Sequence, residues 1–254
     1  MNHSEIWRHI IDTNGINLRD NFPIITSKQI KESKHSWNGK ENQFEPRILC
    51  KMDFSNSRPM FFRVNNISLI GISKNKWLFT KNNIYFKLNK YHTCPRFVNR
   101  QTDSILLEYD NTSSESSLLD ILYFNNIFSN IVGEEMKYKI NSSRKTSNFK
   151  TNLNDIEITV KSQYEIDACY ESDNFICIIE AKMNLNCNDF NLRQLYIPFM
   201  STIVKLKSMN ISKTVIPLFI YQDKNRIIHI HELKWRNIKN ISSVDEISYY
   251  QYVI

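Results

Sequence analysis

Two carboxylates and a lysine lie close together in residues 163–182, at positions from which they could assist a metal ion. Asp167 belongs to a segment in which polar and apolar residues alternate, as they do in a half-buried strand. Glu180 and Lys182 end the apolar segment Phe175–Lys182, which is typical of a strand buried on both faces. Residues two apart on a strand point to the same side, so these two side chains are expected to project together, and a hairpin would bring Asp167 beside them.

Charged side chains at the end of a buried strand are costly unless a partner compensates for them. A divalent cation would do so, because Mg²⁺ binds one or two carboxylates together with waters and phosphate oxygens. A lysine beside such a cation can orient or deprotonate the attacking water. The three residues therefore predict hydrolysis of a phosphodiester.

The order Asp167, then Glu180, Ala181 and Lys182, resembles the D…(D/E)-x-K signature of the PD-(D/E)XK, or restriction-endonuclease-like, superfamily. The chain departs from the superfamily name at Ile166, where a proline would stand. A closer resemblance is to a group of type II restriction enzymes with a Q-x-E-x-D strand, an E-A-K strand and an F-N-x-R-Q-L-Y segment. Residues 44–49 and 69–74 also look like the amino-terminal half of that group. The matching residues of the three segments are Gln163, Glu165, Asp167, Glu180, Ala181, Lys182, Phe190, Asn191, Arg193, Gln194, Leu195 and Tyr196.

This resemblance implies an α/β fold (α+β mixed) with a restriction-endonuclease-like core, in which helices flank a mixed central β-sheet. It implies a type II site-specific deoxyribonuclease that cuts double-stranded DNA with Mg²⁺, for which Mn²⁺ would substitute. Asp167, Glu180 and the Ala181 carbonyl would hold the metal, and Lys182 would orient or activate the water. We expect a homodimer in the bacterial cytoplasm, with a cognate DNA methyltransferase as its companion.

The same resemblance implies supporting roles for several residues near the motif. Gln194 and Arg193 would position the site and the DNA backbone, and Gln163 would support them. Glu165 would serve as a supplementary group near the metal, or equally as a salt-bridge partner for Lys182 or Arg193.

Glu115 is a further candidate metal ligand. It lies in the first turn of an expected helix, where the superfamily often has a metal-binding glutamate. The alternative is that Glu115 only favours the positive end of the helix dipole.

Positive charge is concentrated in the first part of the chain. Residues 1–150 hold 22 Lys and Arg against 14 Asp and Glu, whereas residues 151–254 hold 11 against 12. This asymmetry indicates polyanion binding by the first part, with a well-solvated surface as the alternative. The candidate DNA-binding residues are Lys28, Lys31, Arg144, Lys145, Lys150 and Arg193.

Periodicity and capping residues predict two regions. Residues 1–100 would form a DNA-recognition region, with a helix-turn-helix-like pair of helices followed by a β-sheet, and residues 101–254 a catalytic domain. The expected helices cover residues 4–13, 25–33, 114–132 and 188–209, the last capped by Asn188 or Asp189. The expected strands lie within residues 48–88, 163–169, 175–182, 215–221 and 227–233, and residues 136–154 form a basic segment before the catalytic strands.

Composition excludes several other classes of protein. The five cysteines contain no Cys-x-x-Cys pair, which argues against a disulfide framework or a zinc site. The four glycines are far apart, so no glycine-rich phosphate loop can be built from them. No apolar run approaches the ~20 residues of a membrane span, and the amino terminus lacks a signal peptide, so we expect no membrane partner.

Two alternative functions remain open. A structure-selective or repair nuclease would keep the same fold and change only the DNA that is cut. A non-catalytic DNA-binding module with a decayed nuclease core is the other alternative. The presence of Asp167, Glu180 and Lys182 together argues against a decayed core.

Overall fold

The structure is a computed structural model of the chain, and it describes most of the residues. The described residues are 3–20, 22–40, 43–89, 91, 93–102, 104–107, 109, 112–153, 156–183 and 188–254, without the side chains of residues 141–143. They form a mixed α/β fold, in agreement with the fold class expected from the sequence.

A seven-stranded sheet organises the larger part of the molecule. Its strand order is β5-β14-β13-β12-β10-β9-β6, and neighbours are antiparallel except for the parallel pairs β10–β12 and β14–β5. The strands are β5 (Arg96–Phe97), β6 (Tyr138–Thr146), β9 (Gln163–Glu171), β10 (Phe175–Lys182), β12 (Thr214–Gln222), β13 (Ile227–Trp235) and β14 (Val244–Val253).

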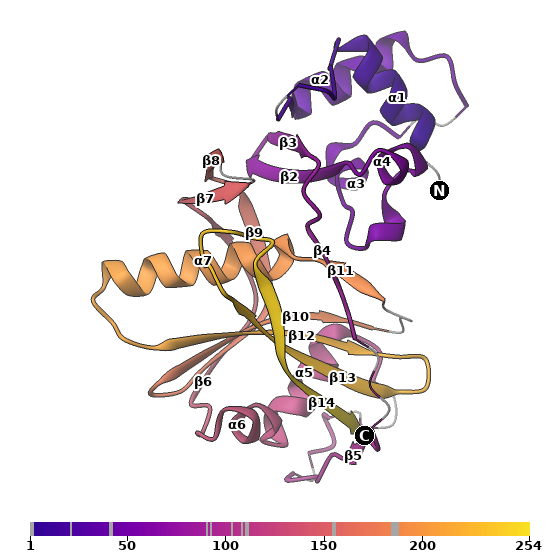
Figure 1. The fold of residues 1–254 in the computed structure, drawn as a ribbon. Coiled ribbons are helices and arrows are strands. Elements are labelled where there is room, and N and C mark those ends of the chain that lie inside the picture. The colour runs from indigo at the N-terminus through magenta and orange to yellow at the C-terminus, as the bar shows by residue number, and fades with distance from the viewer. Residues whose placement is uncertain are drawn as a thin grey trace.

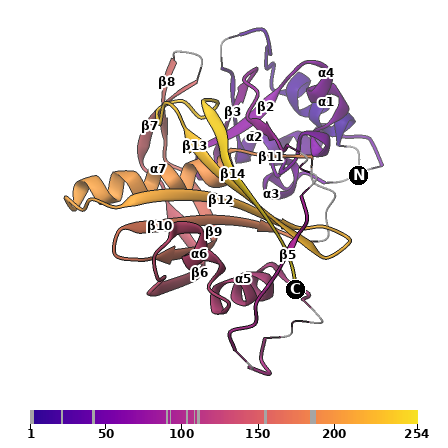
Figure 2. The same ribbon diagram turned by 60° about the horizontal axis from the view of Figure 1, so that its bottom comes forward.

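Helices cover both faces of this sheet (Figures 1 and 2). Helix α7 (Arg193–Ser208) packs on one face, next to the hairpin of β7 (Phe149–Leu153) and β8 (Ile156–Val160). Helices α5 (Glu115–Phe124) and α6 (Ile127–Val132) pack on the other face. Strand β10 lies in the middle of the sheet, which explains why its sequence is apolar on both sides.

The amino-terminal elements have a core of their own, in which Trp7, Phe62 and Phe79 contact one another. A small antiparallel sheet has the order β1-β3-β2. The elements are α1 (Ser4–Thr13), β1 (Ile24–Thr26), α2 (Ser27–Glu32), η1 (Ser33–Ser36), α3 (Pro46–Leu49), η2 (Ser55–Ser57), α4 (Met60–Val64), β2 (Ser68–Ser73) and β3 (Lys76–Thr80).

A two-stranded sheet connects the amino-terminal elements with the larger part that is built on the seven-stranded sheet. Strand β4 (Tyr85–Lys87) pairs with β11 (Asp189–Asn191), immediately before α7. The amino-terminal core extends to Phe79, whereas Tyr85 belongs to the core of the larger part. The sequence placed the division at residue 100. In the structure Phe79 is the last residue of the amino-terminal core, while Ile70 and Leu78 of β2 and β3 already belong to the core of the larger part.

Several expected elements are confirmed. Helix α1 has the expected bounds, and α2 is capped by Thr26 in a capping box with Gln29. Strands β10, β12 and β13 lie where their apolar patterns predicted them. The hairpin turn between β9 and β10 is shorter than expected, because β9 continues to Glu171.

Other expectations were wrong for identifiable reasons. Residues 48–54 and 60–73 were expected to be strands, but Pro46–Leu49 and Met60–Val64 form the helices α3 and α4, since Pro46 occupies the first turn of one and Pro59 precedes the other. The helix expected to reach residue 132 is divided at Asn126, whose φ of 59° is left-handed.

The helix expected from residue 188 begins only at Arg193. Asp189 does not cap it but lies in β11, where its carboxylate accepts hydrogen bonds from the backbone N–H and the hydroxyl of Ser55. Helix α7 continues through Pro198 without interruption. The segment of residues 136–154 forms β6 and β7, and β14 was not foreseen. No helix in the described part of the chain is both long and apolar enough to cross a membrane.

Candidate active site

The hairpin of β9 and β10 brings Asp167, Glu180 and Lys182 together on the face of the sheet that α7 covers. Asp167 Oδ2 accepts a hydrogen bond of 2.8 Å from the backbone N–H of Ala181. Glu180 is 6 % exposed, and its Oε1 lies 2.5 Å from Lys182 Nζ. The alternation of side chains along the two strands therefore produces the cluster that the spacing predicted.

Lys182 Nζ is the cation at the centre of this cluster. Besides Glu180 it contacts the Ala181 carbonyl oxygen at 3.0 Å and Glu115 Oε1 at 3.9 Å. The ammonium therefore contacts oxygen atoms of both Glu180 and Ala181, which the resemblance assigns to the metal. Glu115 comes from the first turn of α5, so its position beside Lys182 agrees with its expected place next to the motif.

Gln194 joins the cluster from the first turn of α7. Its Nε2 donates to Glu180 Oε1 at 2.5 Å, and its buried Oε1 has no hydrogen-bond partner among the described residues. Such an orphaned acceptor is costly, and a water or another bound donor normally compensates for it.

Burial and crowding of carboxylates shift the pKa values of the site. Burial raises the pKa of Glu180 to about 8, and Asp167 adds to this effect while Lys182 opposes it. Burial also raises the pKa of Glu115, again opposed by Lys182. For Lys182, burial lowers the pKa, but Glu180, Asp167 and Glu115 outweigh burial and raise it. Burial and the neighbouring carboxylates thus disfavour the charged forms of Glu115 and Glu180, and Lys182 favours them.

Asp53 is a site residue that sequence reasoning missed. Its side chain is 14 % exposed and lies 3.8 Å from Arg193 Nη2 and 3.6 Å from Lys51 Nζ. Asp53 also contributes to the raised pKa values of Glu115 and Glu180. No signal in the sequence marked it, because its segment was expected to be a strand.

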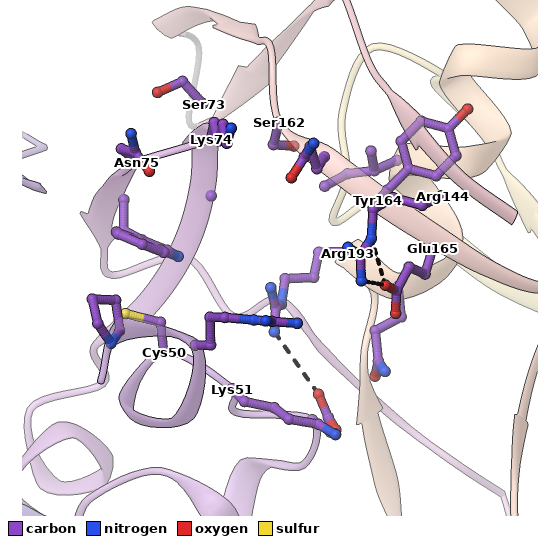
Figure 3. A pocket seen from close by; sticks show the side chains of 18 of the residues that line it. Cys50, Lys51, Ser73, Lys74, Asn75, Arg144, Ser162, Tyr164, Glu165 and Arg193 are labelled. Carbon is purple, nitrogen blue, oxygen red and sulfur yellow. Dashed lines mark hydrogen bonds and ion pairs between the residues drawn. The ribbon is translucent and has the colours of Figure 1, made fainter. Parts of the chain in front are cut away.

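The cluster lies in a cavity of about 720 Å³ between the amino-terminal elements and the sheet (Figure 3). In Figure 3, Ser73 ends β2 and Lys74 follows it in the turn to β3, and Arg144 and Glu165 lie across the cavity from them. The cationic lining residues are Lys31, Arg47, Lys51, Lys74, Arg144, Lys182 and Arg193. Carboxylates at the sheet and cations around them make a site for a negatively charged substrate.

A hollow of about 600 Å³ shares Ser27, Lys31, Ser73, Lys74 and Asn75 with this cavity. Its cationic residues are Lys28, Lys31, Lys74, Lys76 and Lys161. The cavity and the hollow together give a basic surface that begins at the carboxylates and follows the β2–β3 turn.

Only some of the other expected DNA-binding residues lie at the cavity or the hollow. Arg144 lines the cavity, but Lys145 and Lys150 do not, and Lys150 pairs with Glu157 instead. Lys28 pairs with Glu32 at 3.7 Å.

Glu165 lines the cavity together with Gln163, and it bonds neither Lys182 nor Arg193. Its carboxylate accepts from Arg144 Nε at 2.8 Å, because the register of β6 and β9 places the two residues opposite each other. The expected salt bridge of Glu165 with Lys182 or Arg193 was therefore wrong.

The donors at the site suit a hard cation. Among the described residues, no three His, Cys, Asp or Glu side chains form a ready-made metal site. Mg²⁺ does not need one, because it retains several waters and uses one or two carboxylates plus substrate oxygens. Asp167 and Glu180, with Gln194 and its orphaned oxygen beside Glu180, fit that requirement.

Comparison with known proteins finds two family models that match adjoining parts of the chain. Residues 80–253 match the family described as "Domain of unknown function (DUF6997)", and residues 4–79 match "Domain of unknown function (DUF6996)". The first match covers most of the chain, which therefore belongs to the DUF6997 family. No curated protein matches.

A solved structure described as "Crystal structure of SSO0001" is 16 % identical, with a TM-score of 0.24. The match covers 47 % of this chain and 52 % of that one, so the chain spans about half the length of SSO0001. A TM-score at this level carries no argument about fold or function.

Proposed function

We propose that this member of the DUF6997 family is a metal-dependent endonuclease of double-stranded DNA, of the type II restriction kind. One observation carries the proposal: Asp167, Glu180 and Lys182 meet in a cavity whose lining carries six further Lys and Arg side chains against four further carboxylates. The antiparallel pair β9–β10, followed by α7 and the parallel strand β12, supports a restriction-endonuclease-like core.

Asp167, Glu180 and the Ala181 carbonyl would hold Mg²⁺ or Mn²⁺. When bound, the ion would neutralise phosphate charge and lower the pKa of a water molecule. Lys182 remains an ammonium because its pKa is raised, so its role is to orient the water and to balance charge on the phosphate. In the structure its ammonium donates to Glu180 and to the Ala181 carbonyl, two of the groups that would hold the metal.

The basic surface would hold the DNA backbone. Lys31, Lys74 and Arg144 lie around the cavity, and the lysines of the adjoining hollow extend the same surface. Such contacts fix the register of the duplex but carry no sequence information by themselves. A two-fold dimer for a palindromic target, and a companion methyltransferase, belong to the same proposal.

Incubation of the purified protein with unmethylated phage DNA, with Mg²⁺ or with EDTA, tests the proposal on a gel. Discrete fragments with Mg²⁺ alone are expected, and the sequences of their ends would give the target site. Glu180→Gln should abolish the fragments, whereas Lys137→Met, which only removes an exposed pair with Asp173, should leave them unchanged.

The two alternatives predict different results. Cleavage confined to flaps or junctions would favour the structure-selective or repair nuclease over the restriction enzyme. A salt-sensitive mobility shift without cleavage at any Mg²⁺ or Mn²⁺ concentration would overturn the nuclease proposal in favour of a binding module.

A further inference from the structure

The tip of the β2–β3 hairpin lies at the boundary between the cavity and the basic hollow. Strand β2 ends at Ser73 and β3 begins at Lys76, and these two residues pair, so Lys74 and Asn75 form the hairpin tip. Ser73, Lys74 and Asn75 line both the cavity that holds the catalytic cluster (Figure 3) and the adjoining hollow of lysines. The hairpin tip therefore has the cavity on one side and the hollow on the other.

The backbone of the hairpin tip is anchored by two other segments of the chain. Ser27 N–H, at the start of α2, donates to the Asn75 carbonyl at 2.9 Å. Lys161 N–H donates to the Ile72 carbonyl at 2.8 Å, two residues before β9 begins. Because β9 carries Asp167, these bonds fix the hairpin tip relative to the catalytic cluster. An element held in this way can present a side chain to DNA in one position.

The side chains at the hairpin tip are free to meet a partner, although their backbone is anchored. Lys74, Asn75 and Lys76 are all exposed. Among the described residues, the Asn75 side chain makes one polar contact, in which its Oδ1 lies 3.5 Å from the Ser27 hydroxyl. This distance is longer than that of a usual O–H···O hydrogen bond. The amide therefore keeps both a donor and an acceptor for a bound molecule.

An amide between two lysines can recognise what the lysines cannot. Lysine contacts with phosphates fix the register of a duplex but carry no sequence information. An asparagine amide can bond N6 and N7 of an adenine together, and it does so in the major groove, which is wide enough for a two-stranded β-ribbon. With the hairpin tip in that groove, the two DNA backbones that border it would lie on either side, one in the cavity and the other in the hollow.

We infer that the hairpin tip enters the major groove of the DNA and that Asn75 reads a base there, as a specificity-determining residue. The inference rests on the proposed function and assigns the reading of sequence to one element of the amino-terminal part. Lys74 and Lys76 contact the phosphates beside the hairpin tip, and the strand to be cut lies in the cavity.

Cleavage of a set of duplexes by the full chain tests this inference. The target is first obtained from the fragment ends that the unaltered protein gives, and duplexes then carry either this target or one of its single base-pair substitutions. Discrimination is the ratio of kcat/KM for the target to kcat/KM for a substituted duplex. At one base pair, and at its symmetry mate in a palindrome, Asn75→Ala should lower it by roughly 5- to 150-fold, the contribution of one bidentate contact. At the other base pairs discrimination should be unchanged.

Asn225→Ala is the matched control. Lys224 and Asn225 are likewise exposed in a hairpin turn, between β12 and β13, and they line neither the cavity nor the hollow. This variant should discriminate like the unaltered protein. Competition binding of the same duplexes in Ca²⁺ repeats the comparison if Asn75→Ala cuts too slowly, and thermal unfolding checks that both variants are folded.

The results separate this inference from the proposed function. Discrimination by Asn75→Ala that equals that of the unaltered protein at every base pair would overturn the inference and leave the nuclease proposal standing. A loss of rate and affinity by the same factor on every duplex would mean that Asn75 contacts a phosphate, which also overturns the inference. An unaltered protein that cuts no duplex refutes the proposed function itself, and the inference with it.

Discussion

At the scale of single residues, Lys182 is the group whose removal should separate catalysis from metal binding. We expect Lys182→Met to slow DNA cleavage by roughly 10²- to 10⁴-fold, the usual contribution of a positioned proton-transfer or water-orienting group. Mn²⁺ binding should persist, because the ammonium contacts the oxygen atoms of Glu180 and Ala181 rather than supplying a ligand. Initial cleavage rates and Mn²⁺ titrations check both parts, and a loss of Mn²⁺ binding would show that Lys182 holds the site together instead.

The raised pKa of Glu180 predicts a pH dependence of metal binding. A protonated carboxyl is a poor ligand, so protons compete with the metal below the Glu180 pKa of about 8. Mn²⁺ affinity should therefore rise as pH increases from 6 to 8 and then level off, with release of a proton. Calorimetric titrations in buffers of different ionisation enthalpy measure that proton, and an affinity independent of pH in this range would contradict the prediction.

The same titration affects the stability of the metal-free protein. The pKa of Glu180 is raised from 4.5 to about 8 in the folded state, so the folded protein binds more protons than the unfolded chain between these values. The free energy of unfolding in EDTA should consequently fall as pH rises through this range. Glu180→Gln should show a shallower dependence in urea titrations at pH 5 and pH 8, since it lacks the titrating group.

At the scale of elements, the buried side chain of Asn191 connects the two parts of the molecule. Its Nδ2 donates to the Met52 carbonyl, and its Oδ1 accepts from Arg193 N–H at 3.1 Å, at the start of α7. Asn191→Ala would leave both backbone groups without that partner, at a cost of about 1–3 kcal/mol. Urea unfolding measures the loss, and Asn65→Ala, at an exposed helix end, should change stability far less.

Elements could be predicted from the sequence where the order of apolar and polar residues reflects which faces of the element are buried. Strand β10 is apolar on both sides because it is central, and α1 places its apolar residues on one buried face. Sequence reasoning failed for α3 and α4, which are each about one turn long and are held by packing and by their prolines rather than by periodicity. It also failed for β14, most of whose residues are only half-buried and show no clear alternation.

The same distinction applies to the candidate site. Asp167, Glu180 and Lys182 could be predicted because they lie on two consecutive strands, where local geometry decides what meets. The contact between Asp53 and Arg193 could not, because it depends on the hydrogen bonds of Asn191 to the Met52 and Asp53 carbonyls, which join distant parts of the chain. The ion pair of Glu165 with Arg144 could not be predicted for a similar reason. It depends on the register of β6 against β9, which the sequence of neither strand determines alone.

At the scale of the whole molecule, Lys74 in the β2–β3 turn and Lys76 at the start of β3 should control DNA affinity without affecting the chemistry. Lys74 and Lys76 form no ion pair among the described residues and line the basic hollow. The double variant Lys74→Gln, Lys76→Gln should bind DNA more weakly and reduce the salt dependence of binding by up to about two counterions. Fluorescence anisotropy at several salt concentrations in Ca²⁺ measures this.

Lys234→Gln is the control for that experiment, because Lys234 is exposed on β13 and does not line the cavity or the hollow. An unchanged salt dependence in the double variant would place the DNA elsewhere on the molecule. Cleavage at saturating DNA concentration should be the same in all three proteins.

The pairing of β4 with β11 also has a consequence during synthesis on the ribosome. The amino-terminal elements emerge early, but Asn191, the anchor of the Asp53 backbone, emerges only after the strands that carry Asp167 and Glu180. Gln194 follows directly, and β12, which pairs with β10 along its whole length, comes later still. A nascent chain that ends before β12 therefore lacks an assembled centre, and any activity of the site would begin only after that strand has been translated.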